Sequence, residues 1–240
     1  MRHRFETSLP RFIWIGLFAI STACAGIFVT AFDVAPARAA EPKKEIVILA
    51  LGDSLTAGFQ LPPDKAFPAQ LQAALRAKGH AVRVLNAGVS GDTAADGAAR
   101  LDWSLSEPVD AAIIELGAND MLRGLDPKQT EASLDVILKA LTETRVELLI
   151  AGMEPLRNWG EDYAAKFRAM WPRLAKDYNA ILYPFFLKGV ATVAALNQPD
   201  GLHPTADGVA VIVRNILPDV EKLIARVKER RSARTDSTFN

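Results

Sequence analysis

The chain has 240 residues, half of them hydrophobic, with 28 basic and 28 acidic side chains. This length and apolar content suit one domain with a substantial core and disfavour a second domain. The balanced charge disfavours nucleic acid as a partner, because contacts with phosphates need an excess of positive charge.

The first forty residues differ in composition from the rest of the chain. Three arginines precede an apolar run over 12–32, and the small residues Ala37 and Ala39 fit a cleavage site. This order is typical of a signal peptide, so we predict that residues 1–39 are removed and that the protein is secreted, with the periplasm as its expected compartment. The alternative is an uncleaved anchor, because about twenty apolar residues can span a bilayer. Polar residues within the run favour cleavage.

Cys24, the sole cysteine of the sequence, lies inside this predicted signal peptide. The mature chain therefore has no thiol, which excludes a disulfide, a cysteine nucleophile and a thiolate metal site. Removal of residues 1–39 also takes away four basic and two acidic side chains, which leaves 24 basic against 26 acidic residues.

Five short apolar runs have the length and branching of buried strands. They follow a polar linker over 40–45 and lie at 46–51, 82–85, 111–116, 146–150 and 181–185. The first is unbroken, as in a strand of a parallel sheet that is buried on both faces, and each of the next three contains one charged residue. The fifth contains Pro184, which lacks a backbone donor and places this strand at an edge of the sheet.

Helical patterns separate these runs. Apolar side chains recur at helical spacing over 66–78, 127–141 and 163–174, another helix is expected from Thr93 to about Leu105, and the clearest repeat covers 209–227. Residues 186–201 are expected to be loop-like or weakly helical, which makes them a candidate substrate wall. Residues 228–240 are charged and small, and we expect them to be disordered.

This alternation predicts one α/β domain over 46–227, with a five-stranded parallel sheet, helices on both faces and right-handed crossovers. We expect the strand order 2-1-3-4-5. In such sheets, ligands bind outside the carboxyl ends of the strands. Ser54, Gly91 and Asn119 each follow a different strand, so the fold is expected to bring them to one edge.

Ser54 stands in Gly52-Asp53-Ser54-Leu55, where the first strand stops. A serine here has a free hydroxyl and backbone amides nearby, which suits a nucleophile. The alternative is that Asp53 or Ser54 only turns the chain or caps a helix. We interpret Asp53 as a residue that shapes the turn.

A serine nucleophile needs a base, and histidine is the natural base near neutral pH. His3 lies in the predicted signal peptide and His80 in an exposed connection at the opposite edge, which leaves His203. Asp200 precedes it by three residues, close enough to accept the Nδ1 proton and orient the ring. The alternative is that Asp200 caps a turn and His203 is a surface residue. One aspartate and one histidine are too few for a metal site.

Acyl transfer also needs hydrogen-bond donors for the developing oxyanion. The candidates are the backbone N–H groups of Ser54 and Gly91 and the side-chain amide of Asn119. Glycine lets the backbone approach a substrate closely, and the asparagine amide is a neutral donor. We interpret the neighbouring Asp92 and Asp120 as loop or helix-capping residues.

Four blocks of the sequence resemble, in the same order, those of the SGNH (GDSL-type) hydrolases: Gly52-Asp53-Ser54-Leu55, Ser90-Gly91-Asp92-Thr93, Gly117-Ala118-Asn119-Asp120 and Asp200-Gly201-Leu202-His203. The resemblance covers about 46–227 and implies a flavodoxin-like three-layer α/β/α sandwich. It also implies a catalytic triad and an oxyanion hole without a cofactor, with the triad formed by Ser54, Asp200 and His203 and the oxyanion hole by Ser54, Gly91 and Asn119. Position 56 is threonine, so the Gly-x-Ser-x-Gly elbow of the α/β-hydrolases is absent.

Within this family the chain most resembles the secreted, multifunctional acyl thioesterase, lysophospholipase and arylesterase subgroup, through 86–93, 183–186 and the export signal. We therefore expect a serine esterase that hydrolyses aryl esters, acyl thioesters or lysophospholipids through an acyl-serine intermediate. Its expected partners are small-molecule or lipid esters, with transient contact to membrane lipid and with neither nucleic acid nor metal. The alternatives are a carbohydrate O-acetylesterase acting on envelope polysaccharide and a non-catalytic periplasmic binding module.

Apolar residues on the predicted edge segments favour a slot for an acyl chain, although the same residues also suit a core. They are Leu55, Phe59, Leu61, Leu156, Trp159, Phe185 and Phe186.

Overall fold

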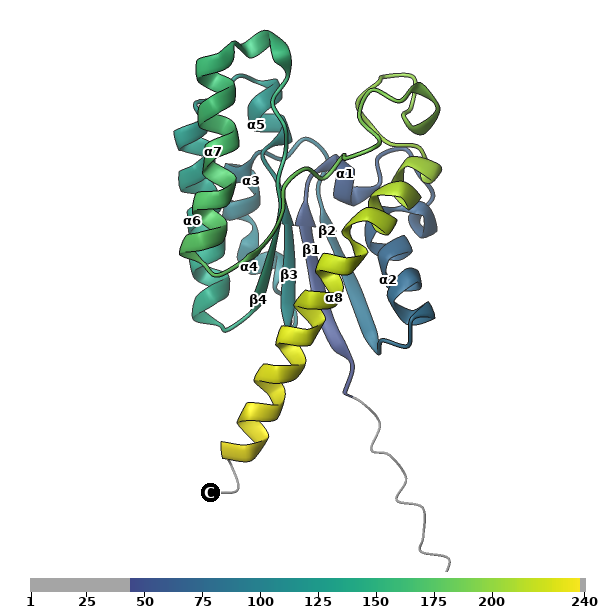
Figure 1. Cartoon of the computed structure of the whole chain (residues 1–240), viewed down its shortest axis with the longest axis vertical. Helices are drawn as coiled ribbons and strands as arrows, with labels where there is room; N and C mark the ends of the chain where they lie inside the picture. Colours follow the sequence, from purple (N-terminus) through teal and green to yellow (C-terminus); the bar gives the residue numbers. More distant parts are fainter. Residues whose placement is uncertain (1–43, 238–240) are drawn as a thin grey trace, which may run out of the picture. The chain divides into compact units, whose positions relative to one another are not determined.

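The computed structural model describes residues 44–237 (Figure 1), so the predicted signal peptide, most of the linker and residues 238–240 lie outside the described residues. Five strands form one parallel sheet in the order β2-β1-β3-β4-β5. The predicted order and the edge position of the proline-containing strand are both confirmed. The strands are β1 (Ile46–Gly52), β2 (Val82–Gly88), β3 (Ala111–Glu115), β4 (Glu147–Ala151) and β5 (Ile181–Tyr183).

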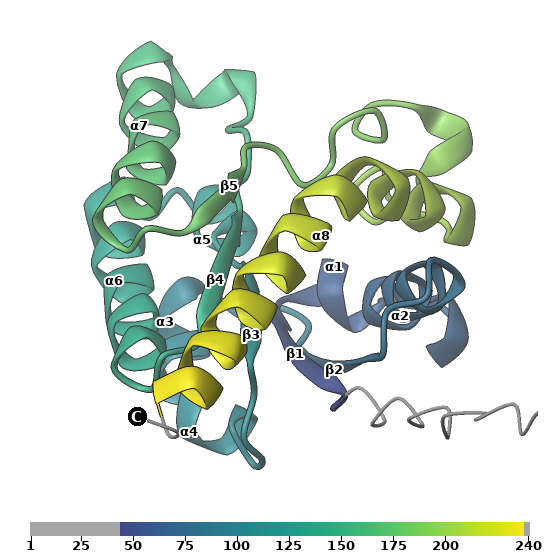
Figure 2. The same cartoon turned by 60° about the horizontal axis from the view of Figure 1, so that its bottom comes forward.

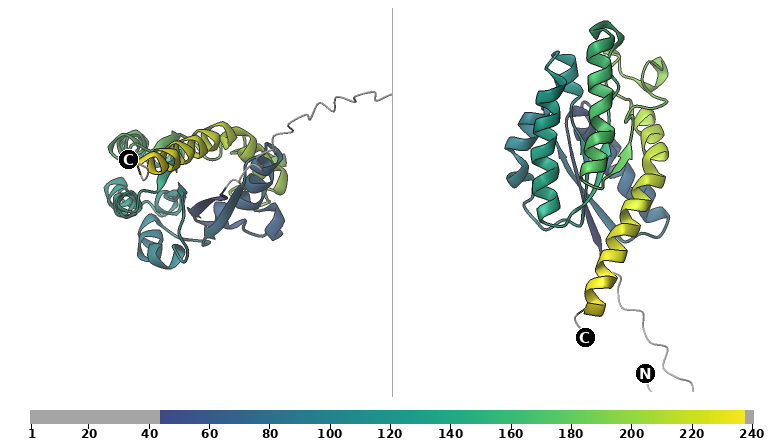
Figure 3. Two further views of the ribbon diagram at one scale, coloured as in Figure 1. Left: turned by 90° about the horizontal axis from the view of Figure 1, so that it is seen from below. Right: turned by 60° about the vertical axis from the view of Figure 1, so that its left-hand side comes forward.

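Helices cover both faces of the sheet, which is why the strands are rich in apolar residues (Figures 1 and 3). On one face α2 (Phe67–Ala77) packs against α8 (Ala206–Ser237), and on the other α3 (Ala94–Ala99) and α7 (Glu161–Asp177) pack on either side of α6 (Pro127–Glu143). The shorter helices are α1 (Ser54–Ala57), α4 (Leu101–Ser104) and α5 (Ala118–Leu122), with 3-10 turns η1 (Pro63–Lys65), η2 (Arg157–Trp159) and η3 (Ala194–Leu196).

One face of helix α8 is apolar and packs against the sheet. The members of its 3.6-residue repeat are all buried, as the sequence predicts: Val209, Ile212, Val213, Ile216, Val220, Leu223, Ile224 and Val227. No helix within residues 44–237 is both long and apolar enough to cross a membrane.

The prediction of a disordered tail over 228–240 is wrong for the part that the structure describes, because α8 continues to Ser237. Arg231 reaches the Asp110 carboxylate, with Nη2 2.6 Å from Oδ2, and the same carboxylate oxygen accepts the N–H of Val47 at the start of the sheet. Arg230 donates to the backbone oxygen of Asp110. The composition of residues 228–240 indicated a solvated tail, but the charged side chains of Arg230 and Arg231 attach this part of α8 to the sheet.

The chain from β5 to α8 crosses the carboxyl ends of the strands (Figure 2). It leaves β5 at one edge of the sheet and reaches α2 beyond the other, where Gln70 Nε2 donates to the backbone oxygen of Ala206 at 3.1 Å. Apart from η3, residues 186–201 are loop, as predicted. This path carries the loop over the end of β1, where Ser54 lies.

Candidate active site

Ser54 is the first residue of α1, directly beyond the end of β1. The turn before it is tight: a Cβ at Gly52 would lie 2.1 Å from Thr56 Oγ1 and 2.7 Å from the backbone oxygen of Glu115. Asp53 caps α1, and its Oδ1 accepts the Leu55 N–H at 2.9 Å. The chain therefore turns sharply from strand to helix and leaves the serine at the edge of the sheet.

The loop before α8 brings His203 and Asp200 to this serine. His203 Nε2 lies 2.9 Å from Ser54 Oγ, and His203 Nδ1 lies 2.7 Å from Asp200 Oδ2. Asp200 Oδ1 accepts the backbone N–H groups of Leu202 and His203 at 2.9 and 3.0 Å. The structure thus brings together the three residues that sequence reasoning singled out, and the Asp200 carboxylate also caps the turn.

These contacts favour the ionised form of Asp200. The backbone N–H groups of His203 and Leu202, followed by the His203 ring, lower the pKa of Asp200 to about 2. An ionised carboxylate at Nδ1 keeps the proton on that nitrogen and directs the Nε2 lone pair to the Ser54 hydroxyl. The ring of Phe59 lies 4.5 Å from the His203 ring and supports it from one side.

The other two histidines do not belong to this site. His3 lies outside the described residues. His80 lies at the opposite edge of the sheet, as expected, but it is partly buried rather than exposed, with Nε2 3.2 Å from the Glu221 carboxylate on α8.

The three predicted oxyanion donors differ in their present contacts. Within residues 44–237, the backbone N–H groups of Ser54 and Gly91 donate to no other atom. Gly91 has a φ of +90°, which glycine adopts readily. The Asn119 amide nitrogen lies 3.1 Å from Asp53 Oδ2 and 3.0 Å from the backbone oxygen of Asp92, so both of its hydrogens are used.

A group of buried carboxyls underlies the nucleophile. Asp53 is fully buried, and burial raises its pKa to about 6. Burial also raises the pKa of Glu115 well above its ordinary value, and Thr56 Oγ1 donates to this side chain at 2.8 Å. Asp120 Oδ2 accepts the Ala94 N–H at the start of α3, in agreement with the predicted capping role. Sequence reasoning did not find Glu115, because a carboxylate at the end of an apolar strand gives no sign of its partners.

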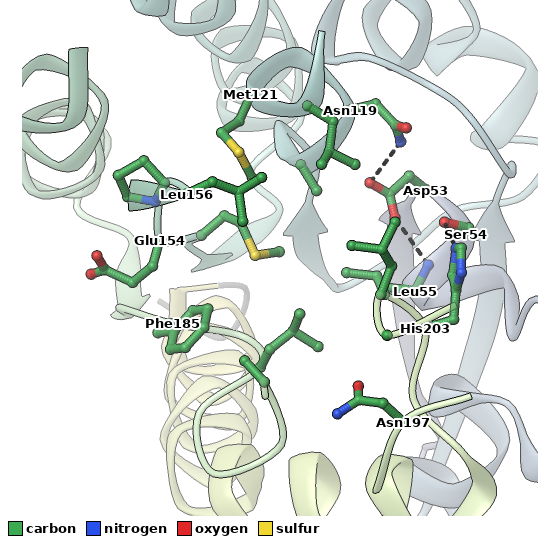
Figure 4. A pocket seen from close by; sticks show the side chains of 18 of the residues that line it. Asp53, Ser54, Leu55, Asn119, Met121, Glu154, Leu156, Phe185, Asn197 and His203 are labelled. Atoms are coloured by element: carbon green, nitrogen blue, oxygen red, sulfur yellow. Dashed lines mark hydrogen bonds between the residues drawn. The ribbon is translucent and has the colours of Figure 1, made fainter. Parts of the chain in front are cut away.

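An apolar cleft of about 730 Å³ opens beside Ser54 (Figure 4). Ser54, Asp53 and His203 lie along one side of it, and Glu154 and Phe185 lie across from them. Among its lining residues are the apolar side chains of Leu55, Met121, Leu122, Met153, Pro155, Leu156, Phe185, Leu187 and Leu202. Part of the loop over 186–201 contributes to this wall, as expected.

The seven apolar residues selected from the sequence divide between cleft and core. Leu55, Leu156 and Phe185 line the cleft. Phe186 is fully buried against Phe67 instead, and the remainder, Phe59, Leu61 and Trp159, do not line it. Conversely, Met153 was expected only to pack and also lines the cleft.

A parallel α/β sheet with a serine, histidine and aspartate in hydrogen-bonded sequence at its carboxyl edge defines a hydrolase of the serine type. The family model for the GDSL-like lipase/acylhydrolase family matches residues 50–211. The chain belongs to this family and is a carboxylic ester hydrolase of the GDSL type.

Relatives of known activity agree with this assignment. An arylesterase of Vibrio mimicus is 36% identical over 176 residues, which is 73% of this chain and 88% of the relative. Thioesterase 1/protease 1/lysophospholipase L1 of Escherichia coli K12 is 36% identical over 178 residues, 74% of this chain and 84% of the relative. The crystal structure of AlinE4, an SGNH-hydrolase family esterase, matches with a TM-score of 0.64 and 44% identity, covering 75% of this chain and 96% of that one.

Proposed function

We propose that the chain is a serine esterase in which Ser54 is the nucleophile, His203 the general base and acid, and Asp200 the residue that orients the imidazole. The observation that supports this most directly is the unbroken pair of hydrogen bonds from Asp200 through His203 to Ser54 Oγ, beside the apolar cleft. The hydroxyl is otherwise too weakly acidic to attack an ester at neutral pH.

In the first half of the reaction the acyl group moves to the enzyme. Ser54 Oγ bonds to the carbonyl carbon, its proton passes to His203 Nε2, and the carbonyl electrons move to the oxygen. Collapse of this tetrahedral intermediate breaks the C–O or C–S bond, and His203 returns the proton to the departing alcohol or thiol. Water then attacks the acyl-serine in the same way and releases the acid.

The oxyanion of each intermediate is assigned to three donors. The unoccupied N–H groups of Ser54 and Gly91 supply two of them. The third is the Asn119 N–H that now faces Asp92 O, because an amide hydrogen can be shared between two acceptors. The other Asn119 hydrogen stays on Asp53 and holds the amide plane.

The proposed substrates are carboxylic esters or thioesters with an apolar acyl chain: aryl esters, acyl thioesters and lysophospholipids. The apolar lining of the cleft suits such a chain, and the names of the relatives include arylesterase, thioesterase and lysophospholipase. A panel of p-nitrophenyl esters from acetyl to palmitoyl tests this proposal. We expect higher kcat/KM for medium or long chains, whereas preference for acetyl groups on sugars indicates the carbohydrate O-acetylesterase alternative.

We further propose that the enzyme is exported to the periplasm after removal of residues 1–39 and contacts membrane lipid transiently when it takes a lipid ester. The composition of that segment supports the first part, and the apolar cleft supports the second. N-terminal sequencing of protein from the periplasmic fraction is expected to begin at Ala40. An intact N-terminus in the membrane fraction indicates an anchor.

Replacement of Ser54 by alanine tests the mechanism. We expect Ser54→Ala to lose labelling by a fluorophosphonate probe and nearly all turnover of p-nitrophenyl butyrate, because no other group then forms the acyl intermediate. Ser133→Ala is the control, since its hydroxyl donates to the backbone oxygen of Gln129 within α6 and does not line the cleft. A fully active Ser54→Ala protein contradicts the proposal.

A further inference from the structure

Arg100 lies between α3 and α4 and takes no part in the reaction described above. Its side chain is 15% exposed, and each of its three nitrogens has one partner. Nε lies 2.5 Å from Asp92 Oδ2, Nη2 lies 2.9 Å from the backbone oxygen of Gly52, and Nη1 lies 2.9 Å from Ser104 Oγ. These bonds fix the guanidinium between the turn at Gly52 and the loop that contains Asp92.

Those two loops carry the backbone donors assigned to the oxyanion. Gly52 is two residues before Ser54, and Asp92 is the residue after Gly91. The planar guanidinium of Arg100 bonds to both Gly52 O and the Asp92 carboxylate, so it connects the loop of Ser54 to the loop of Gly91. The Val89 N–H also donates to Gly52 O at 3.0 Å, so the connection has two parallel bonds.

The third donor depends on the same arginine through Asp92. The backbone oxygen of Asp92 accepts from the Asn119 amide at 3.0 Å, while its carboxylate is held by Arg100. A shift of Asp92 therefore moves the acceptor that orients Asn119. Arg100 is therefore linked to all three oxyanion donors. It bonds to Gly52 and Asp92, which are close in the chain to Ser54 and Gly91, and Asp92 O accepts from Asn119.

We propose that Arg100 is a positioning residue for the oxyanion hole, which fixes the spacing between the Ser54, Gly91 and Asn119 donors without touching the substrate. A planar guanidinium suits this task because it places several N–H bonds in a fixed geometry. A lysine ammonium reaches the Asp92 carboxylate but does not reproduce the fork to Gly52 O. This inference rests on the proposed serine esterase mechanism.

Steady-state kinetics of Arg100→Ala and Arg100→Lys with p-nitrophenyl butyrate test the proposal. Displacement of donors by less than 1 Å lowers transition-state stabilisation, so we expect kcat to fall about tenfold to a hundredfold in Arg100→Ala, with KM changed less than about threefold. The kcat of Arg100→Lys is expected to lie between that of the wild type and that of Arg100→Ala. Guanidinium chloride at low millimolar concentration is expected to restore part of the kcat of Arg100→Ala.

A double-mutant cycle separates positioning from general destabilisation. Asn119→Ala is expected to lower kcat about a hundredfold to a thousandfold alone. In the Arg100→Ala background it is expected to cost about tenfold less, because Asp92 O, one of the two acceptors of the Asn119 amide, is then no longer held in place.

The matched control is Arg76→Ala. Arg76 also donates to a strand carbonyl and a carboxylate, with Nε 2.8 Å from Val82 O and Nη2 3.2 Å from Glu45 Oε1, but at the opposite end of β2. The kcat of Arg76→Ala is expected to equal that of the wild type at temperatures where both proteins are folded.

Three results overturn the inference: Arg100→Ala with the kcat of Arg76→Ala, a loss confined to KM, or full additivity with Asn119→Ala. Failure of the proposed function itself is distinguishable, because the wild-type protein then fails to react with the fluorophosphonate probe.

Discussion

At the scale of single residues, Asp53 connects the fold to the chemistry. One carboxylate oxygen caps α1 and the other orients Asn119, while the side chain is fully buried. Sequence reasoning assigned it a role in the turn, which the cap to Leu55 agrees with. The contact with Asn119 could not be foreseen, since the two residues are far apart in the chain.

The raised pKa of Asp53 predicts a pH dependence of stability. Between about pH 4 and pH 6 the folded protein holds a proton on Asp53 that the unfolded chain has released, so the contribution of Asp53 to stability falls as the pH rises through this window. The change amounts to about 3 kcal/mol for a shift of this size. Asp53→Asn removes this contribution. Urea unfolding at pH 4 to 7 is expected to show the variant gaining stability relative to the wild type as the pH rises, and a constant difference contradicts the assignment.

The proposed reacting residues could be selected from the sequence, but the residues that position them could not. Ser54 and Asn119 follow strands, so parallel topology placed them at one edge, and Asp200 lies within one turn of His203. Arg100 could not be found in this way, because its contact with Gly52 joins positions 48 residues apart and arginine in a helical stretch usually indicates only a solvated face.

At the scale of elements, the loop before α8 depends on close packing at Gly208. A Cβ at this position would lie 2.2 Å from the backbone oxygen of Leu196. The Thr205 N–H donates to the same oxygen, and Asn197 forms a bridge with Pro204, so these contacts join the two ends of the segment that contains Asp200 and His203.

Gly208→Ala is expected to lower both stability and activity. Helix propensity favours alanine, but the contact with Leu196 O forces the loop away, with a net cost of about 1 to 3 kcal/mol and a fall in kcat as His203 shifts. Gly79→Ala is the control. The backbone there has a φ of +82°, which strains an alanine, but an added Cβ would have no atom within 4 Å, and the position lies away from the site. Thermal unfolding and kcat are measured for both. Normal kcat in Gly208→Ala contradicts this role.

The strands were predictable because a parallel strand buried on both faces is mostly apolar, and Pro184 indicated the edge of the sheet. The helix expected from Thr93 to Leu105 is instead two helices that meet at Arg100. A break there has no sign in the sequence, because it is determined by contacts of Arg100 with distant backbone.

At the scale of the whole molecule, α8 runs from the active-site edge to the opposite edge of the sheet. It begins just after His203, and towards its C-terminal end Arg231 donates to Asp110, which also accepts the Val47 N–H. The continuation of this helix past Val227 could not be predicted from periodicity, because ion pairs of Arg230 and Arg231 rather than apolar side chains attach it there.

Asp110→Ala is expected to lower the free energy of unfolding by about 1 to 3 kcal/mol, because it leaves a strand N–H and partly buried arginines without this carboxylate. Activity of the folded protein is expected to stay within about twofold of the wild type, since the change lies at the far end of the sheet. Glu143→Ala, an exposed change on α6, is the control in urea titrations and esterase assays. No loss of stability contradicts the anchoring of α8.

The segment between β5 and α8 carries the proposed general base, its carboxylate partner and part of the wall of the cleft. In evolutionary terms, the shape of the cleft and the proposed proton transfer are therefore inherited together. An exchange of this segment between related enzymes transfers part of the cleft wall together with the histidine and its carboxylate partner. Directed evolution for a new acyl group is consequently expected to select compensating changes in the β1 turn, to restore the alignment of Ser54 with a displaced His203.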